Sequence, residues 1–205
     1  MSIEKKKIGI FGGSFSPPHR GHLAAARAFL KEAELDALYV IPAGIPPHKT
    51  LKGDATPAQR VEMCRLTFGE LPRTEILTLE IDRGGKSYTS DTLMTLSSPE
   101  SELFLLMGTD MFLTLDSWHC PQTIFSLSTV VLMRREGDAV LSERIREKEQ
   151  LYREKFGARL CKLLSPHLEV SSEFIRGRLS RQEEIAAYVV PSVEEYIQQW
   201  QLYRA

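Results

Sequence analysis

The chain has 205 residues, of which 42% are hydrophobic and 26% charged, enough for one well-buried α/β domain and too few for two full ones. Its formal net charge of -1 implies no general electrostatic attraction to nucleic acid or to a membrane surface. No apolar run approaches the roughly 20 residues of a membrane span and no signal-type apolar core is present, so we expect a cytoplasmic protein. Cys64, Cys120 and Cys161 are far apart, which favours reduced thiols over disulfides or a zinc cluster.

The first predicted elements are a strand, a glycine turn and a helix. Residues 8–11 form the short apolar run of a strand in a parallel sheet. Gly12 and Gly13 then supply a turn at which the backbone can approach a ligand closely. The following segment, residues 23–33, carries apolar positions on one face of a helix.

His19 and His22 lie three residues apart at the predicted beginning of this helix. The first N–H groups and the positive end of the helix dipole attract an anion there. Each imidazole can also donate a hydrogen bond to a phosphoryl oxygen, a contact worth roughly 3 kcal/mol in a transition state. A histidine that only caps the helix is the simpler alternative for either residue alone, but the pair on a glycine turn favours phosphate binding.

Residues 37–41 predict a second strand that ends at Pro42. The stiff loop beyond it holds His48 and Lys49 at the carboxyl end of a strand, where open α/β sheets bind ligands, although a rigid surface turn is the alternative.

A second helix is predicted from Thr56-Pro57 to just before Gly69. Its ordinary core face comprises Val61, Cys64 and Phe68, with Arg60 and Arg65 elsewhere. Residues 74–81 predict a third strand, followed by a turn-rich loop over 82–86.

Hydroxyl groups crowd the next predicted helix start, over residues 87–93. From these residues alone, Thr89 or Ser90 is expected to cap the helix.

Residues 103–107 form a nearly pure apolar run, typical of a central strand covered on both faces. Gly108 and Asp110 follow at its carboxyl end, where the carboxylate suits ribose hydroxyls or a magnesium-bound water, or else caps the next helix. Trp118 comes soon after, as a core or interface residue or as a flat apolar plate on which a ligand's ring can stack.

Residues 129–133 predict the fifth strand, and Arg134-Arg135 places positive charge at its carboxyl end. A solvated helix is expected over 138–156 and a last short strand over 167–170.

A second helix-start anion site is predicted over residues 170–176. Ser171 and Ser172 can cap this helix, and Arg176 can hold two phosphate oxygens at once. A capping box of Ser192 and Glu195 is expected to begin the final amphipathic helix, which runs to Trp200.

Several of these segments resemble one family. The stretch from Gly12 to His22, Gly-Gly-Ser-Phe-Ser-Pro-Pro-His-Arg-Gly-His, is similar to the GGSFDPxHxGH signature of the H-x-G-H nucleotidyltransferases, specifically the bacterial nicotinate-nucleotide adenylyltransferases. The segments 46–49, 87–93, 108–110 and 170–176 resemble its PPHK, third binding, GxD and ISSTxIR segments. Ser16 stands in place of the family's aspartate, and Glu173 in place of its threonine.

The resemblance implies the role of each candidate residue. It makes His19, His22 and Arg176 catalytic. It assigns ATP to Gly12, Gly13, Ser14, Phe15, Gly108, Asp110, Ser171, Ser172 and Ile175. It assigns the pyridine mononucleotide to His48, Lys49, Thr89, Trp118, His119 and Arg134. No residue is assigned to a protein-bound metal, and Mg²⁺ is expected to accompany ATP.

The expected fold is a single-domain Rossmann-like α/β structure over residues 1–205, with a doubly wound parallel sheet. Neither G-x-G-x-x-G nor G-x-x-x-x-G-K-[ST] is present, which disfavours a dehydrogenase or a Walker-type ATPase. The resemblance implies transfer of AMP from ATP to nicotinate mononucleotide in NAD biosynthesis, with small-molecule partners and a possible homo-oligomer. The alternatives are a related enzyme acting on nicotinamide mononucleotide or phosphopantetheine, and a non-catalytic nucleotide sensor.

Overall fold

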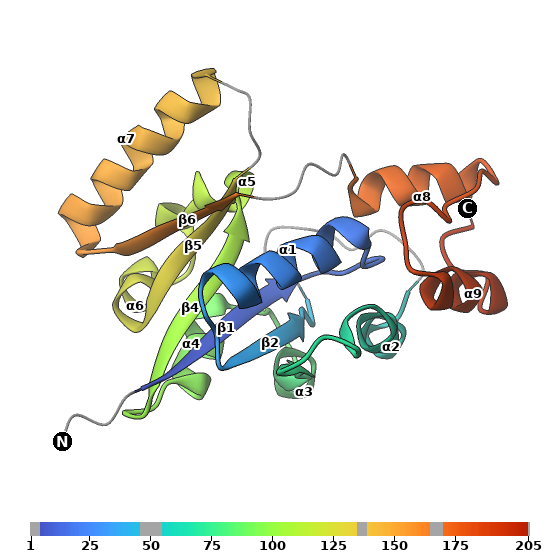
Figure 1. The fold of residues 1–205 in the computed structure, drawn as a ribbon, viewed down its shortest axis with the longest axis horizontal. Coiled ribbons are helices and arrows are strands. Elements are labelled where there is room, and N and C mark those ends of the chain that lie inside the picture. Colours follow the sequence, from blue (N-terminus) through green and yellow to red (C-terminus); the bar gives the residue numbers. More distant parts are fainter. Residues whose placement is uncertain (1–4, 46–54, 135–138, 165–169, 205) are drawn as a thin grey trace.

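The computed structural model describes residues 5–45, 55–134, 139–164 and 170–204. Figure 1 shows the arrangement of its helices and strands. The strands are β1 (Lys6–Gly13), β2 (Ala37–Pro42), β3 (Thr74–Ile76), β4 (Ser101–Gly108), β5 (Ser128–Arg134) and β6 (Arg159–Leu164). The helices are α1 (Arg20–Glu32), α2 (Pro57–Phe68), α3 (Leu79–Arg83), α4 (Thr89–Leu96), α5 (Thr109–Phe112), α6 (Pro121–Leu127), α7 (Ala139–Phe156), α8 (Ser172–Ser180) and α9 (Pro191–Gln199), with a 3₁₀ turn, η1, at Leu115–Ser117.

The six strands form one parallel sheet in the order β3-β2-β1-β4-β5-β6. The chain winds outward from β1 in one direction and then, from β4, in the other. The predicted doubly wound, Rossmann-like α/β fold is therefore confirmed. In such sheets the crevice at the reversal point, between β1 and β4, is where ligands bind.

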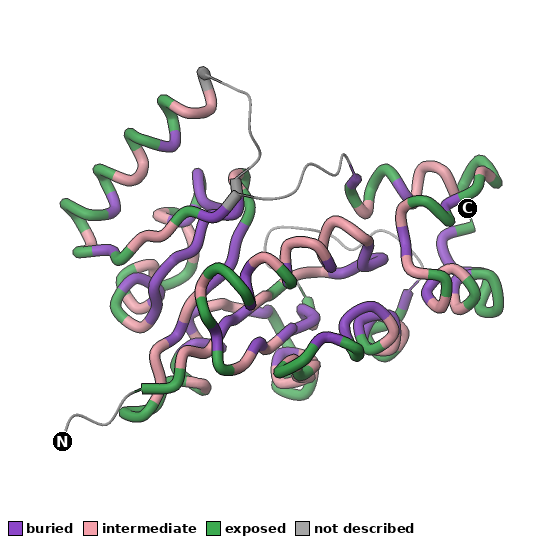
Figure 2. The backbone as a smooth tube through the Cα atoms, in the orientation of Figure 1, coloured by how far each residue is buried: buried purple, intermediate pink, exposed green. Residues whose placement is uncertain are grey.

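Apolar side chains cover both faces of the sheet. One core cluster packs α1 and α2 on the first face, around Phe29 and Phe68, and another packs α4 to α7 on the second, around Phe125 and Tyr152. In Figure 2 the sheet is mostly buried while the helices expose their outer sides. Burial on both faces explains why these strands have continuous apolar sequences.

A third apolar cluster joins α8 and α9 to α2. It includes Met63 of α2, Ile175 of α8 and Ile197 of α9, all essentially fully buried. In Figure 1 this C-terminal group lies beside the amino ends of α1 and α2 and far from α7. Within the described ranges, no helix is long and apolar enough to cross a membrane.

The expected third strand over 74–81 is too long. The strand ends at Ile76, and α3 begins at Leu79. Leu77 and Leu79 both pack against the core cluster of the second face, and Glu80 is buried, where its carboxylate accepts a 2.7 Å hydrogen bond from the Thr92 hydroxyl. This local packing overrides the alternating pattern.

The last strand also differs from the expectation. It is β6, Arg159–Leu164, at the sheet edge, whereas Val170 is not in a strand and residues 167–169 lie outside the described residues.

Two expected helix caps are wrong as well, because the N-caps of α4 and α9 are Tyr88 and Val190, without side-chain capping bonds.

Gly9 in β1 allows α1 to pack directly on the sheet. A Cβ atom at this position would lie 2.4 Å from Leu35 Cδ1 and 2.8 Å from Phe29 Cε1, and both residues are fully buried. We expect Gly9→Ala to lower the free energy of unfolding by about 1–3 kcal/mol through overpacking, as measured by urea denaturation. Gly12→Ala is the matched control, since its Cβ would meet nothing within 4 Å. Equal stability of the two variants would contradict this account of the helix–sheet contact.

Candidate active site

The glycine-rich strand ends meet at one edge of the sheet. Gly13 of β1 is paired with Pro42 of β2, and Gly108 of β4 with Met133 of β5. Since β1 and β4 are neighbours, Gly12, Gly13 and Gly108 lie at the reversal point. Gly12 is exposed and faces open space, and Asp110 is exposed in α5, so this edge can receive a nucleotide.

His19 and His22 cap α1 reciprocally. The backbone N–H of His22 donates to Nδ1 of His19 at 3.3 Å, and the backbone N–H of His19 donates to Nδ1 of His22 at 3.2 Å. The rings are stacked, with centroids 3.6 Å apart. A nitrogen that accepts a hydrogen bond carries no hydrogen, so this pattern assigns the proton of each neutral ring to Nε2, the atom that can donate to a phosphoryl oxygen.

The surroundings of His22 keep its ring neutral. Burial, followed by the neighbouring His19 imidazole, holds the pKa of His22 well below its usual value. Capping and phosphate binding, which the sequence presents as alternatives, are thus compatible, because capping uses Nδ1 and leaves Nε2–H as the donor.

Two first-turn amides of α1 have protein partners. The N–H of Arg20 donates to the carbonyl of Tyr188 at 2.8 Å, and the N–H of His22 donates to His19. The expected anion site made of free helix N–H groups is therefore smaller than the sequence suggests. The imidazoles supply donors at this helix end.

The second signature segment contacts the first directly. Arg176 Nη1 donates to the carbonyl of Ser16 at 2.6 Å, and the Ser172 hydroxyl donates to the carbonyl of Pro17 at 2.8 Å. Ser171 caps α8 by accepting from the N–H of Phe174 at 3.1 Å. The arginine and the histidine pair, which the sequence predicts at one polyphosphate, therefore lie in adjoining segments.

Gly21 permits this close approach. A Cβ at Gly21 would lie 3.0 Å from His19 Nδ1 and 3.0 Å from Val170 Cγ1, between the histidine pair and the residue that leads into α8.

The two departures from the family pattern have distinct surroundings. Ser16 is buried, and its hydroxyl lies 3.0 Å from the hydroxyl of Tyr203 near the end of the chain. Glu173 is exposed in the first turn of α8, where a carboxylate interacts favourably with the helix dipole.

Two predicted ATP ligands are core residues. The Phe15 side chain is 1% exposed and packs edge-on against His22 at 5.1 Å, so its ring positions the histidine. The Ile175 side chain is 0% exposed, and its N–H donates to the carbonyl of Ser171. Ile175 therefore supports α8 from the core, and its assignment to ATP stays a prediction.

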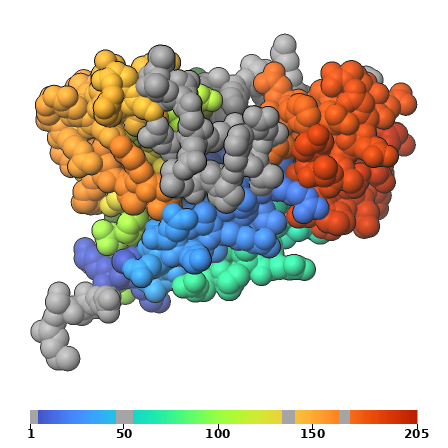
Figure 3. Space-filling view, turned by 45° about the horizontal axis from the view of Figure 1, so that its top comes forward, coloured from blue at the N-terminus to red at the C-terminus, as the bar shows by residue number. Residues whose placement is uncertain are grey.

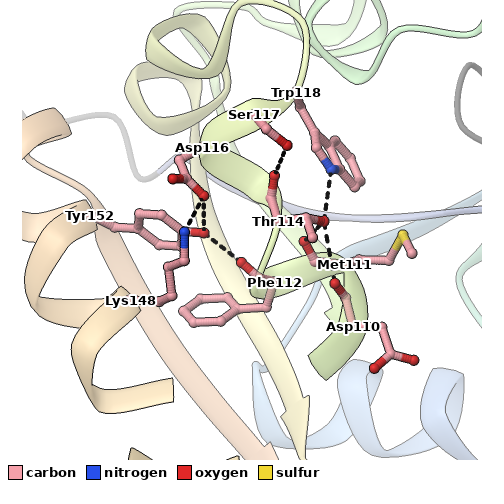
Figure 4. A network of polar contacts seen from close by, with 9 residues as sticks. All are labelled: Asp110, Met111, Phe112, Thr114, Asp116, Ser117, Trp118, Lys148 and Tyr152. Atoms are coloured by element: carbon pink, nitrogen blue, oxygen red, sulfur yellow. Dashed lines mark hydrogen bonds and ion pairs between the residues drawn. The ribbon is translucent and has the colours of Figure 1, made fainter. Parts of the chain in front are cut away.

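Trp118 is held by a turn that α7 anchors (Figure 4). Its indole N–H donates to the Thr114 hydroxyl at 3.3 Å. Two residues before it, Asp116 accepts a 2.7 Å bond from Lys148 and lies 3.1 Å from the Tyr152 hydroxyl, which also donates to the Phe112 carbonyl at 2.6 Å. Burial raises the pKa of Asp116, but the contacts with Lys148 and Tyr152, a backbone hydrogen bond and the positive charge of Lys148 together lower the pKa overall.

The expected pyridine-binding segments also meet. The His119 ring packs against the Tyr88 ring with centroids 4.2 Å apart and a tilt of 32° between the planes, and Tyr88 is the N-cap of the helix that Thr89 begins. The structure therefore brings Thr89 close to the Trp118-His119 segment. His48 and Lys49 lie outside the described residues, as does Arg135, and for Arg134 only the backbone at the end of β5 is described.

Three residues near the site have no counterpart among the predicted site residues: Arg60, Tyr88 and Tyr203. Arg60 is fully buried and donates to the carbonyls of Ser14 and Gly44. A sequence signal for it exists, since Arg60 precedes Cys64 and Phe68 at helical spacing of four and is thus on their buried stripe.

Figure 3 shows α1 between the C-terminal helices on one side and the α7 region on the other. A separate open hollow of about 400 Å³, lined by Arg27, Lys31 and Arg73 among others, lies at the carboxyl end of α1, away from the histidine pair. It is not part of the candidate site.

Comparison with known proteins agrees with this geometry. Residues 10–178 match the family model described as cytidylyltransferase-like. A "Probable nicotinate-nucleotide adenylyltransferase" of Trichlorobacter lovleyi is 34% identical, over 97% of this chain and 99% of the relative. Another protein of that name, from Albidiferax ferrireducens, is 36% identical over 97% and 98%.

Solved structures share the fold. A nicotinic acid mononucleotide adenylyltransferase of Plasmodium falciparum, complexed with NaAD, superimposes with a TM-score of 0.75 at 18% identity, over 97% of each chain. At 18% identity this structural likeness establishes the fold alone. The matches of the sequence to the family model and to the relatives establish the family. The chain therefore belongs to the cytidylyltransferase-like family and, within it, to the nicotinate-nucleotide adenylyltransferases.

Proposed function

We propose that the protein transfers AMP from ATP to nicotinate mononucleotide, giving nicotinate adenine dinucleotide and pyrophosphate. The observation that carries this proposal is the reciprocal capping of His19 and His22, which makes Nε2–H the donor of each neutral ring, next to the segment that Arg176 contacts. The relatives named for this activity support the choice of reaction.

The reaction needs no general base. The 5′-phosphate of the mononucleotide is already an anion at neutral pH, and one of its oxygens forms a bond to the α-phosphorus while the bond to the leaving pyrophosphate breaks. Negative charge grows on the oxygens around phosphorus and on the leaving group. Catalysis then consists of in-line positioning and of donors aimed at this charge. His19 and His22 would donate to the α- and β-phosphates, and Ser172 and Arg176 would face the β,γ end.

A divalent cation would be bound mainly by ATP. In the ranges that the structure describes, no three His, Cys, Asp or Glu residues gather into a metal site. Mg²⁺ needs no such cluster of protein ligands, because it keeps several waters and binds through substrate phosphates and one or two carboxylates. Asp110, exposed after β4, would contact a water of the ion, and the bound ion would offset phosphate charge.

The pyridine end of the substrate is proposed to bind beside α4. Thr89 begins this helix, where the dipole favours a carboxylate such as that of nicotinate, and the half-buried Trp118 offers a flat face for the ring. The contacts of His48, Lys49 and Arg134 with the mononucleotide remain predictions. So do a cytoplasmic location, a homo-oligomer and the action of residues 1–205 as one domain.

The test of the proposed function is a substrate panel followed by pyrophosphate release. ATP is supplied with nicotinate mononucleotide, nicotinamide mononucleotide or phosphopantetheine. We expect turnover with the acid to exceed turnover with the amide, and none with phosphopantetheine. Preference for the amide or for phosphopantetheine would move the protein to another branch of the superfamily, and pyrophosphate from none of the three would favour a nucleotide sensor.

Two substitutions of His22 test the role of its Nε2–H donor separately from the role of its Nδ1 acceptor. Asparagine places an acceptor near the Nδ1 position and loses the distal donor, whereas glutamine can place an amide N–H near the Nε2 position. We expect His22→Asn to lower kcat about 10²- to 10³-fold with nearly unchanged stability. His22→Gln should retain more of kcat at similar stability, because a glutamine at the same helical position, Gln59 of α2, accepts from the N-cap N–H of Thr56 at 2.8 Å. Kinetics and urea denaturation of both variants check this difference in kcat, and near-normal turnover of His22→Asn would remove His22 from the mechanism.

The lowered pKa of His22 also predicts how stability depends on pH. Between the folded pKa and about 6.5 the unfolded chain binds a proton at His22 that the folded chain does not, so the free energy of unfolding falls as the pH falls. The slope from this group is at most about 1.4 kcal/mol per pH unit. Urea denaturation at about pH 7.5 and about pH 5.5 should show a smaller loss for His22→Asn than for the natural protein. Identical losses would show that His22 titrates normally.

A further inference from the structure

Helix α2 presents one stripe of side chains to the loop that follows β1. Arg60, Cys64 and Phe68 are spaced four residues apart, and all are fully buried. Phe68 packs edge-on against Phe15, with ring centroids 5.7 Å apart, and Phe15 packs against His22. The helix thus supports the histidine pair through an aromatic chain.

Arg60 joins the two loops at the ends of β1 and β2. Its Nη1 donates to the carbonyl of Ser14 at 2.9 Å, and its Nη2 donates to the carbonyl of Gly44 at 3.2 Å. Ser14 belongs to the loop that leads to the histidines. Gly44 begins the connection that leads, along the sequence, to His48 and Lys49.

The Gly44 loop has further fixed contacts. The N–H of Ala43 donates to the carbonyl of Gly13 at 2.9 Å, and the N–H of Gly44 donates to the hydroxyl of Ser87, two residues before Thr89, at 2.8 Å. The Arg60 guanidinium therefore adds a side-chain link, beside this backbone bond, between the expected ATP loop and a loop that is itself tied to the expected pyridine segment.

Stability alone does not explain a buried guanidinium here. Among the residues that the structure describes, no carboxylate forms an ion pair with Arg60, and its buried Nε has no hydrogen-bond partner. Burial lowers the pKa of Arg60, and the neighbouring Tyr203 and Cys64 oppose this effect. A buried cation without a carboxylate is costly, and an apolar residue of similar size would cost less. We therefore look for a role of Arg60 in its two hydrogen bonds to backbone carbonyls and not in its packing.

We propose that Arg60 is a positioning residue that couples the two substrate loops, holding the Ser14 and Gly44 carbonyls at the spacing that aligns the attacking phosphate with the α-phosphorus of ATP. The planar guanidinium suits this role, because it points two donors in fixed directions, as lysine cannot. The proposal rests on the proposed function for the identity of the second substrate, and on the hydrogen bonds alone for the coupling.

The test compares Arg60→Lys with a matched control, Arg73→Lys. Arg73 Nη1 also donates to a backbone carbonyl, that of Leu35 at 2.7 Å, but at the carboxyl end of α1. In Arg60→Lys we expect kcat to fall about 10- to 100-fold through misalignment, while the Kd of a non-hydrolysable ATP analogue alone changes less than about threefold. In the natural protein we expect saturating nicotinate mononucleotide to tighten this Kd, because the coupled loops order together, and in Arg60→Lys this tightening should disappear. Arg73→Lys should retain both kcat and the tightening.

A readout without substrates keeps this inference separate from the reaction. Backbone hydrogen exchange in the ligand-free protein should accelerate at both segments 13–15 and 42–45 in Arg60→Lys, and at neither in Arg73→Lys. If Arg60→Lys does not fold, Ser87→Ala, which frees the N–H of Gly44 from the other side, should give a smaller loss of the same tightening.

Two results would overturn the inference: unchanged kcat and exchange in Arg60→Lys, or equal defects in Arg60→Lys and Arg73→Lys. If the natural protein instead rejects nicotinate mononucleotide while the exchange pattern appears, the proposed substrate fails and the coupling stands.

Discussion

Two hydrogen bonds, from Arg176 to the Ser16 carbonyl and from Ser172 to the Pro17 carbonyl, hold the candidate site together. They join residues 160 and 155 positions apart in the sequence. Contacts between residues so far apart in the sequence form only when the sheet, α1 and the C-terminal helices are all in place. The histidine pair is fixed locally by its own caps, but its position relative to the second phosphate-binding segment depends on the complete fold. The site is therefore built by assembly of the chain and not by any single motif.

Local sequence patterns were sufficient for much of the fold. The strands β1, β2, β4 and β5 are buried between helices on both faces, so their apolar runs are continuous and their ends carry glycine, proline or arginine. The spacing of His19 and His22 places both on the first turn of α1. The strand β6 was missed because it lies at the sheet edge and mixes Arg159 and Lys162 with apolar residues. The boundary between β3 and α3 was misplaced because packing of Leu77 and Leu79 decides it.

Long-range polar contacts account for the rest of what the sequence could not predict. The expectation that Arg60 lies off the core face of its helix is wrong: its spacing places it on the buried stripe with Cys64 and Phe68, but its two carbonyl partners, 46 and 16 positions away, are known only from the fold. The Ser16 hydroxyl finds its partner, Tyr203, 187 positions along the chain. The reciprocal caps of His19 and His22 also go beyond the motif, because spacing alone does not show that Nδ1 of each ring is used by the backbone. In each case a residue type was visible, but its partner came from the fold.

The hydrogen at Gly21 in place of a side chain has a consequence for how this site can vary. Any larger residue there would place a Cβ atom 3.0 Å from both the His19 ring and Val170, so that one or both would have to move. The same displacement would separate the amino end of α1 from the approach to α8 and lengthen the contacts that unite the two halves of the site. Both imidazoles could thus be present, chemically intact, and yet face a polyphosphate at the wrong distance.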